Sequence, residues 1–311
     1  MLNYKKYIKE SSEAKYMLLN KVNKKKLFFE RFGKEFFFKY FNWRYLLTKK
    51  PSLFHIEYKV TTHCTLKCKD CCHYAPYFEH HIDNVSFEKF KKEIDELLKY
   101  TDIIYALALM GGETFLAKDL AKMVKYALSK KQIKFIEITT NATILPDDEL
   151  IKVLRNRKDC IVGISDYRSN ETLKSRLHIE EIRNIFDKNN ILYILSDFDS
   201  GTVPNWQMPP LVLEPNKKEG NLTTTNNCRI KNCHTYANGI LYLCPLQFYM
   251  LFGKDGYKVK SDEIVNIFDK ENVVKKLLDF YTKSSFEFCN YCVLENTKTE
   301  IPAAIQLQEQ R

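Results

Sequence analysis

Hydrophobic and polar positions alternate with two different periods along the middle of the chain. Short apolar runs rich in Ile, Val and Tyr predict strands, and apolar residues spaced three or four apart predict helices between them. The expected strands are 55–61, 103–109, 133–139, 160–165 and 191–195, and the expected helices are 86–99 with Ser86 as N-cap, 117–129, 147–156 and 171–187. Strands that alternate with helices of this length predict βα units and a parallel sheet.

Compositional changes divide the chain further. Residues 1–54 are basic and aromatic, and the pattern favours helices that pack on the main domain; the alternative is a surface for a membrane, a substrate or a partner. Residues 55–213 hold the βα pattern. Residues 214–293 form a second, cysteine-rich unit, and residues 294–311 are expected to be a loosely ordered tail.

Composition narrows the class of protein. The chain has 311 residues and 45% hydrophobic residues, which suffices for a buried core, and its net charge of +10 arises before residue 55 and suits an anionic partner or substrate. The first residues lack the apolar run of a secretion signal, and no segment approaches the length of a transmembrane helix. We therefore expect a cytoplasmic protein, in which clustered cysteines favour metal or redox chemistry.

Three of the ten cysteines follow the first expected strand directly. Cys64, Cys68 and Cys71 have the spacing C-x3-C-x2-C. Thiolates this close on one loop can bind three irons of a [4Fe–4S] cluster and leave the fourth iron open. The alternative is a zinc site completed by His63 or Cys72; otherwise Cys72 is expected to be a bystander.

This motif, at this place in a βα repeat, resembles the radical S-adenosylmethionine (SAM) superfamily. The second expected strand is followed by MGGETFL, which resembles the GGE motif of that family, the third by TTNATIL and the fourth by GISDYR. The resemblance extends over about residues 55–293. It implies an α/β fold, with a partial (β/α)6 barrel of the TIM type, a basic helical N-terminal extension and a small C-terminal domain for an auxiliary cluster.

The resemblance also implies residue roles. Cys64, Cys68 and Cys71 would bind the cluster whose open iron is chelated by SAM. The SAM-binding residues implied are Tyr74, Gly111, Gly112, Glu113, Thr140, Asn141 and Ser165. The glycines would let the backbone approach the ligand closely. Asp166, Tyr167 and Arg168 are candidates to orient or deprotonate the substrate.

Three positions depart from the family pattern. Thr114 stands where proline is common, and Ala142 stands where glycine is usual. The fourth strand ends in Ser-Asp-Tyr-Arg at 165–168, whereas many peptide-modifying members have Ser-x-Asp-Gly. This last departure weighs against a peptide substrate.

The second cysteine group resembles the half-size SPASM type called a twitch domain. In this resemblance Cys228, Cys244, Cys289 and Cys292 close all four irons of an auxiliary [4Fe–4S] cluster, and Gly239 permits a tight turn. Cys233 is a fifth candidate ligand. A zinc ribbon is the alternative. Cys160, inside an expected strand, is interpreted as a buried apolar residue.

The radical SAM resemblance implies reductive cleavage of SAM to a 5′-deoxyadenosyl radical that abstracts a hydrogen atom. An external one-electron reductant such as flavodoxin or ferredoxin would be needed. The first hypothesis is an oxidoreductase that oxidises or rearranges a small polar, possibly anionic substrate such as a sugar or nucleotide-sugar. The second is a maturase that modifies a ribosomal peptide or a protein side chain. The third is a non-enzymatic iron–sulfur or zinc protein that binds nucleic acid through the basic arm.

Overall fold

A computed structural model describes residues 33–195, 205–209, 228, 233–253, 261–283, 285–293 and 298–307. The first described element is helix α2, Gly33–Thr48. It packs through buried Phe41, whose ring lies 4.8 Å from that of Phe54, and Arg44 pairs with Asp102 at 2.6 Å. Across these ranges no helix combines the length and the apolar character needed to cross a membrane.

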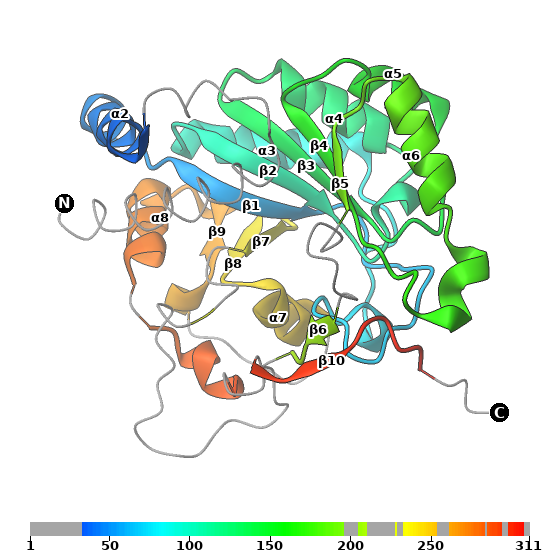
Figure 1. The fold of residues 1–311 in the computed structure, drawn as a ribbon. Helices are drawn as coiled ribbons and strands as arrows, with labels where there is room; N and C mark the ends of the chain where they lie inside the picture. The colour runs from blue at the N-terminus through cyan, green and yellow to red at the C-terminus, as the bar shows by residue number, and fades with distance from the viewer. Residues whose placement is uncertain are drawn as a thin grey trace.

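The βα pattern predicted from the sequence is present. The strands are β1 Leu53–Lys59, β2 Ile104–Met110, β3 Ile133–Thr140, β4 Cys160–Ile164 and β5 Tyr193–Leu195, and the helices are α3 Phe87–Tyr100, α4 Leu120–Ser129, α5 Asp148–Leu154 and α6 Ile179–Lys188. Consecutive strands pair in parallel from β1 to β5. Figure 1 shows α3 to α6 on one face of this sheet.

Side-chain caps explain where the helices start. Ser86 accepts a hydrogen bond from the backbone N–H of Lys89, as predicted, and Asp147 caps α5 in the same way. The helix expected over 171–187 is divided into a 3₁₀ helix, η4 Glu171–Arg176, and α6. The division occurs because the N–H of His178 bonds to the carbonyl of Ala142, outside the helix.

The sheet continues on the other side of β1 with strands from the cysteine-rich unit. Strand β7, His234–Ala237, pairs with β1 in parallel, and β8 Ile240–Tyr242 and β9 Val265–Asn266 follow in antiparallel order. The full order is β5-β4-β3-β2-β1-β7-β8-β9. The α/β prediction is therefore confirmed. The sixth parallel strand is β7, beside β1, and no strand in the described ranges pairs with the free edge of β5.

The remaining elements surround the carboxyl ends of the strands and the cysteine-rich unit. They are η2 Ala75–Tyr77, η3 Thr114–Leu116, β6 Asn205–Gln207, α7 Pro245–Phe248, the π-helix η7 Tyr249–Gly253, η8 Ser261–Glu263, η9 Ile267–Asp269, α8 Val273–Thr282, η10 Glu287–Tyr291 and β10 Glu300–Pro302. β6 and β10 form a separate two-stranded antiparallel sheet.

The two faces of β1 differ sharply in polarity. Phe54, Ile56 and Tyr58 face the helices, and the Tyr58 ring meets Phe90 of α3 at 4.9 Å. Because side chains alternate along a strand, His55, Glu57 and Lys59 face the other way, into the concave interior.

The expectation of a loosely ordered C-terminal tail is wrong for residues 298–307. The N–H of Lys69 donates to the carbonyl of Ile305 at 2.7 Å, and the N–H of Leu307 donates to the carbonyl of Lys67 at 2.7 Å. Figure 1 shows this red segment beside the loop that follows β1. The tail is ordered because it supplies backbone partners to the cysteine loop.

Candidate functional site

The loop that follows β1 carries Cys64, Cys68 and Cys71 at the carboxyl end of the strand. The Cys64 sulfur accepts hydrogen bonds from the Leu66 N–H and the Asn141 amide, each at 3.4 Å. Burial raises the pKa of the Cys64 thiol to about 12 and that of Cys68 to about 11, and the other two thiols of the loop add to the effect on Cys64. A bound cation would reverse this effect, because metals bind the thiolate.

The spacing of these sulfurs distinguishes a cluster from a single ion. Two ligand atoms of a tetrahedral zinc lie about 3.3–3.8 Å apart, as bond lengths of 2.0–2.3 Å require. In the parts of the chain that the structure describes, just one group of three potential ligand atoms lies within 4.8 Å, and it contains none of these three cysteines. His63, one proposed fourth ligand, instead lies 2.7 Å from Asp83. The arrangement fits a four-iron cube better than one zinc ion.

Gly111 and Gly112 bring the end of β2 against the cysteine loop. A Cβ atom on Gly112 would lie 2.4 Å from the carbonyl oxygen of His63 and 2.7 Å from Cβ of Cys64, and one on Gly111 would lie 2.8 Å from Thr61. The sequence argument attributed these glycines to a close approach of SAM. The structure adds that they are required for the packing of one loop on the other.

Glu113 links the carboxyl ends of β2 and β3. Its carboxylate is fully buried and accepts hydrogen bonds from the Thr140 hydroxyl at 2.8 Å, the Asn141 N–H at 2.7 Å and the Phe115 N–H at 2.9 Å. Burial raises the pKa of Glu113, and these hydrogen bonds oppose the shift. The Ser165 N–H donates to the Thr140 carbonyl, so the sequence-predicted residues of β2, β3 and β4 meet at one edge.

Tyr74 lies between the two cysteine groups. Its backbone has a φ of 57°, and its ring stacks on Tyr249 of η7 at 4.7 Å. Burial raises the pKa of the Tyr74 hydroxyl, and the thiols of Cys292 and Cys71 contribute to the shift. The residue that the resemblance assigned to SAM therefore also joins the cysteine loop to the C-terminal unit.

The three candidate catalytic residues after β4 have different environments. Asp166 is 2% exposed and is paired with Arg168, whose Nη2 lies 2.6 Å from a carboxylate oxygen. Tyr167 packs against a buried cluster that includes Leu66 and Cys68, and its ring meets Trp206 at 5.5 Å. Tyr167 therefore borders the cysteine loop.

Four cysteines of the second group lie close together, and the fifth, Cys233, lies apart from them. Burial raises the pKa of the Cys244 thiol well above its ordinary value, and Cys292, Cys228 and Cys289 contribute to the shift, so these four thiols lie near one another. Both residues of the Asn238–Gly239 turn between β7 and β8 have positive φ, 55° and 73°, as a type I′ hairpin requires.

Cys233 does not join this group. Its thiol donates a hydrogen bond to the carboxylate of Glu57 on β1, inside the sheet. Cys233, a fifth candidate ligand of the auxiliary cluster from the sequence, thus lies beside Glu57 instead.

The sequence argument missed an ionisable set on the concave side of β1. Glu57 and Lys59 are buried, Lys59 lies 3.5 Å from Glu57 and 2.8 Å from Nδ1 of His73, and His55 lies 3.2 Å from Glu137. Cys72, which follows the cysteine loop directly, is exposed. The signal was available as polar residues at every second position of HIEYK.

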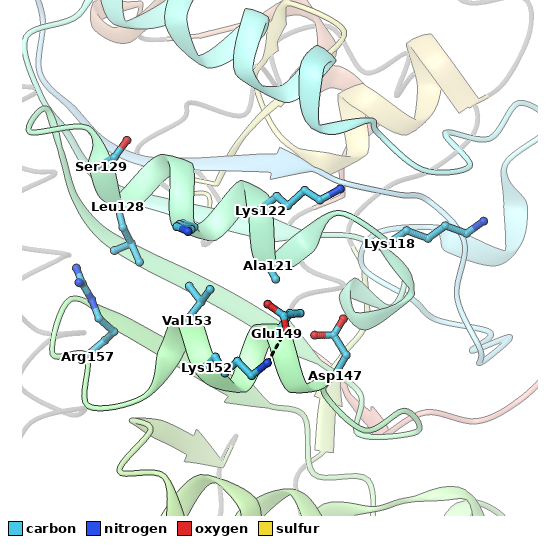
Figure 2. A pocket seen from close by; sticks show the side chains of 11 residues that line it. Lys118, Ala121, Lys122, Leu128, Ser129, Asp147, Glu149, Lys152, Val153 and Arg157 are labelled. Carbon is cyan, nitrogen blue, oxygen red and sulfur yellow. Dashed lines mark hydrogen bonds and ion pairs between the residues drawn. The ribbon is translucent and has the colours of Figure 1, made fainter.

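A basic groove lies elsewhere, between α4 and α5 on the outer helical layer. Figure 2 shows its lining, which is basic: Lys118, Lys122, Lys125, Lys152 and Arg157 against Asp147 and Glu149. Its volume is about 740 Å³, but no cysteine lines it. A smaller hollow beside the cysteine loop is lined by Lys59, His73, Gly111 and Gly112, among other residues.

Comparison with known proteins agrees with the site at the strand ends. Residues 58–184, which run from the end of β1 into α6, match the family model of the radical SAM superfamily. The chain carries a radical SAM domain. Such a domain uses a [4Fe–4S] cluster and SAM, and Cys64, Cys68 and Cys71 fit the cluster in number and in spacing.

One curated relative is similar over part of the radical SAM domain. It is an S-adenosylmethionine-dependent nucleotide dehydratase from Selenomonas ruminantium, 34% identical over 111 residues. The alignment covers 35% of this chain and 39% of the relative. The chain therefore matches about two fifths of that protein's length.

Two solved structures share part of this arrangement of strands and helices. BtrN in complex with AdoMet and 2-DOIA has a TM-score of 0.49 at 14% identity, over 83% of this chain and 100% of that one. SuiB of Streptococcus suis bound to S-adenosylmethionine has a TM-score of 0.37 at 16% identity, over 52% of this chain and 37% of that one.

Proposed function

We propose that this chain is an enzyme that cleaves SAM reductively and removes a hydrogen atom from a small polar substrate, such as a sugar or a nucleotide-linked sugar. The observation that carries the proposal is the set of three thiols on the loop at the carboxyl end of β1, within the segment that matches the radical SAM family model. When bound, the reduced cluster and SAM supply a 5′-deoxyadenosyl radical.

The chain's own residues would prepare the site in three ways. Cys64, Cys68 and Cys71 hold the cluster, and the Asn141 amide donates to the Cys64 sulfur. The buried residues Leu66, Leu173 and Ala304 surround Cys68 and keep water from it. Such exclusion protects a reactive radical from side reactions.

The polarity of the concave interior supports a polar substrate. Lys59, His73 and Cys72 lie where β1 meets the cysteine loop, and Tyr167 borders the same cysteines. The Lys59 ammonium suits an anionic substituent such as a phosphate. The relative named as a nucleotide dehydratase makes a nucleotide or nucleotide-linked substrate the first class to test.

The four thiols of Cys228, Cys244, Cys289 and Cys292 would hold an auxiliary [4Fe–4S] cluster. All four irons of that cluster would have a protein ligand, so its role would be electron transfer rather than substrate binding. An external one-electron reductant such as flavodoxin or ferredoxin would supply the SAM-bound cluster.

The test of SAM cleavage uses the full chain, reconstituted anaerobically and reduced with dithionite. We expect 5′-deoxyadenosine to form in wild type and to fall to background in the Cys64→Ala/Cys68→Ala/Cys71→Ala variant, as measured by liquid chromatography and mass spectrometry. Wild-type protein with a full iron content and no 5′-deoxyadenosine would contradict the proposal.

The substrate class is tested separately. Candidate compounds are grouped as nucleoside triphosphates, nucleotide-sugars, free sugars and short peptides. A compound of the right class should raise the rate of 5′-deoxyadenosine formation. The mass of that compound should also change, which shows that it is the substrate. A response to peptides alone would favour a maturase, and a response to none of the other groups would contradict the small-substrate proposal.

A further inference from the structure

We infer that the concave side of β1 holds a second metal site, for one zinc ion, bound by His55, Glu57 and Cys233. In the described ranges this is the group of three potential ligand atoms that lie within 4.8 Å of one another. It supplies one nitrogen, one oxygen and one sulfur, the donor types that zinc takes in proteins. None of the three residues is assigned above to a cluster or to SAM in the radical SAM site, although Lys59 borders both this site and the proposed substrate region.

The three ligands come from two adjacent elements whose positions are fixed by the sheet. His55 and Glu57 are two residues apart on β1, so both side chains point to the concave side. Cys233 precedes β7, which pairs with β1. Zinc ligands in a tetrahedral site are about 3.3–3.8 Å apart, so a shift of about 1 Å in side-chain position completes the geometry.

A neighbouring carboxylate orients the histidine. Nε2 of His55 lies 3.2 Å from Oε2 of Glu137 on β3. A hydrogen bond from Nε2–H to this carboxylate fixes the tautomer in which Nδ1 carries the lone pair for the metal. A histidine held by a carboxylate in this way is the usual arrangement behind zinc.

A separate observation points to a missing ligand at the same place. Thr235 of β7 is the register partner of Glu57, so both side chains are on the same face. Thr235 is 0% exposed, and its hydroxyl has no hydrogen-bond partner among the residues that the structure describes. Buried hydroxyls nearly always have a partner. A water bound as the fourth zinc ligand would donate to this oxygen.

The charges of the site balance with a divalent ion. The ammonium of Lys59 lies 3.5 Å from the carboxylate of Glu57, so this ligand has a cationic neighbour. Zinc would displace the thiol proton of Cys233 to solvent, with no change of oxidation state. The ion and Lys59 would then offset the Cys233 thiolate and the carboxylates of Glu57 and Glu137.

The experiment measures zinc and iron per chain in anaerobically purified, full-length protein supplied with both metals. We expect about one zinc per chain in wild type. Cys233→Ser and His55→Ala should each lose the zinc and keep the iron. Cys160→Ser, which changes a buried cysteine of β4, is the matched control and should keep both metals.

Other results would overturn the inference. Wild type without zinc, or Cys233→Ser with its zinc retained, would exclude the site. Loss of about four irons in Cys233→Ser would make Cys233 a cluster ligand instead. If the variants do not fold, zinc K-edge absorption on wild type decides. The inference requires one sulfur at about 2.3 Å with the remaining ligands nitrogen or oxygen, and a zinc bound by four sulfurs would overturn it.

Discussion

The side-chain amide of Gln306 donates a hydrogen bond to the sulfur of Cys68 at 3.2 Å, across 238 positions of the chain. The same side chain accepts a hydrogen bond from the Lys67 N–H through its oxygen at 2.8 Å. Gln306 thus contacts both the middle cysteine of the loop and the backbone just before it, and the C-terminal segment becomes part of the environment of the three cysteines.

Replacing Gln306 should change the reduction potential of the first cluster. Hydrogen bonds to cluster sulfurs help to set that potential. Gln306→Leu removes the donor, so we expect a more negative potential, by up to about 60 mV, which is a tenfold change for a one-electron couple. Gln306→Glu keeps the shape and also removes the donor, and should shift the potential at least as far. A redox titration followed by electron paramagnetic resonance measures both, and equal potentials in all three proteins would show that this bond has no electronic role.

The cysteines of this site could be predicted from the sequence, whereas the contact of Gln306 could not. Cys64, Cys68 and Cys71 were predicted because their ligand spacing is local and their strand is recognisable. The contact of Gln306 was not, because nothing in the residues around 306 specifies a partner near residue 68. The spacing of ligands in a short segment can be read from the sequence, whereas a contact between distant residues depends on the complete fold.

The polar residues of β1 were recognised as part of a strand, but no role was predicted for their side chains. The alternation of His55, Glu57 and Lys59 with apolar residues predicted a strand, and the strand is confirmed. Their position in a buried interior could not be predicted, because a half-exposed strand has the same alternation. It follows from β7, which covers the other edge of β1.

Gly112 should be far less tolerant of alanine than Gly163. A Cβ on Gly112 meets the His63 carbonyl at 2.4 Å, whereas the nearest atoms to a Cβ on Gly163 of β4 are 3.8 Å away. Overpacking of this kind costs about 1–3 kcal/mol, and here it would displace the loop of Cys64. We expect Gly112→Ala to lower both the thermal midpoint and the iron content, with Gly163→Ala near wild type in both. Equal iron content in the two variants would contradict the packing role.

Glu93 should make folding stability depend on pH. This residue of α3 is buried and accepts a hydrogen bond from the Tyr58 hydroxyl at 2.8 Å. Burial raises its pKa above the ordinary value of 4.5. The folded state therefore holds the proton more tightly than the unfolded state, so stability contributed by Glu93 is greatest below about pH 4.5 and falls as pH rises through the folded-state pKa.

The variant Glu93→Gln should remove this dependence. We expect wild type to lose stability relative to Glu93→Gln between pH 5 and the folded-state pKa, as measured by denaturant unfolding in matched buffers. Glu149→Gln is the control, because exposed Glu149 pairs with Lys152 and its pKa is lowered, so its contribution is lost only as pH falls below the usual range. A constant difference between wild type and Glu93→Gln across the range would refute the assignment.

The number of irons bound should separate the two cysteine groups. Two four-iron clusters predict about eight irons in wild type and about four in the Cys64→Ala/Cys68→Ala/Cys71→Ala variant. Cys289→Ala/Cys292→Ala should also leave about four, because it removes two ligands from the auxiliary group and none from the SAM-binding loop. The two variants should differ in SAM binding, which needs the open iron of the first cluster. About four irons in wild type would remove the auxiliary cluster from the proposal, while SAM binding that survives the first variant unchanged would remove the cysteine loop from the SAM site.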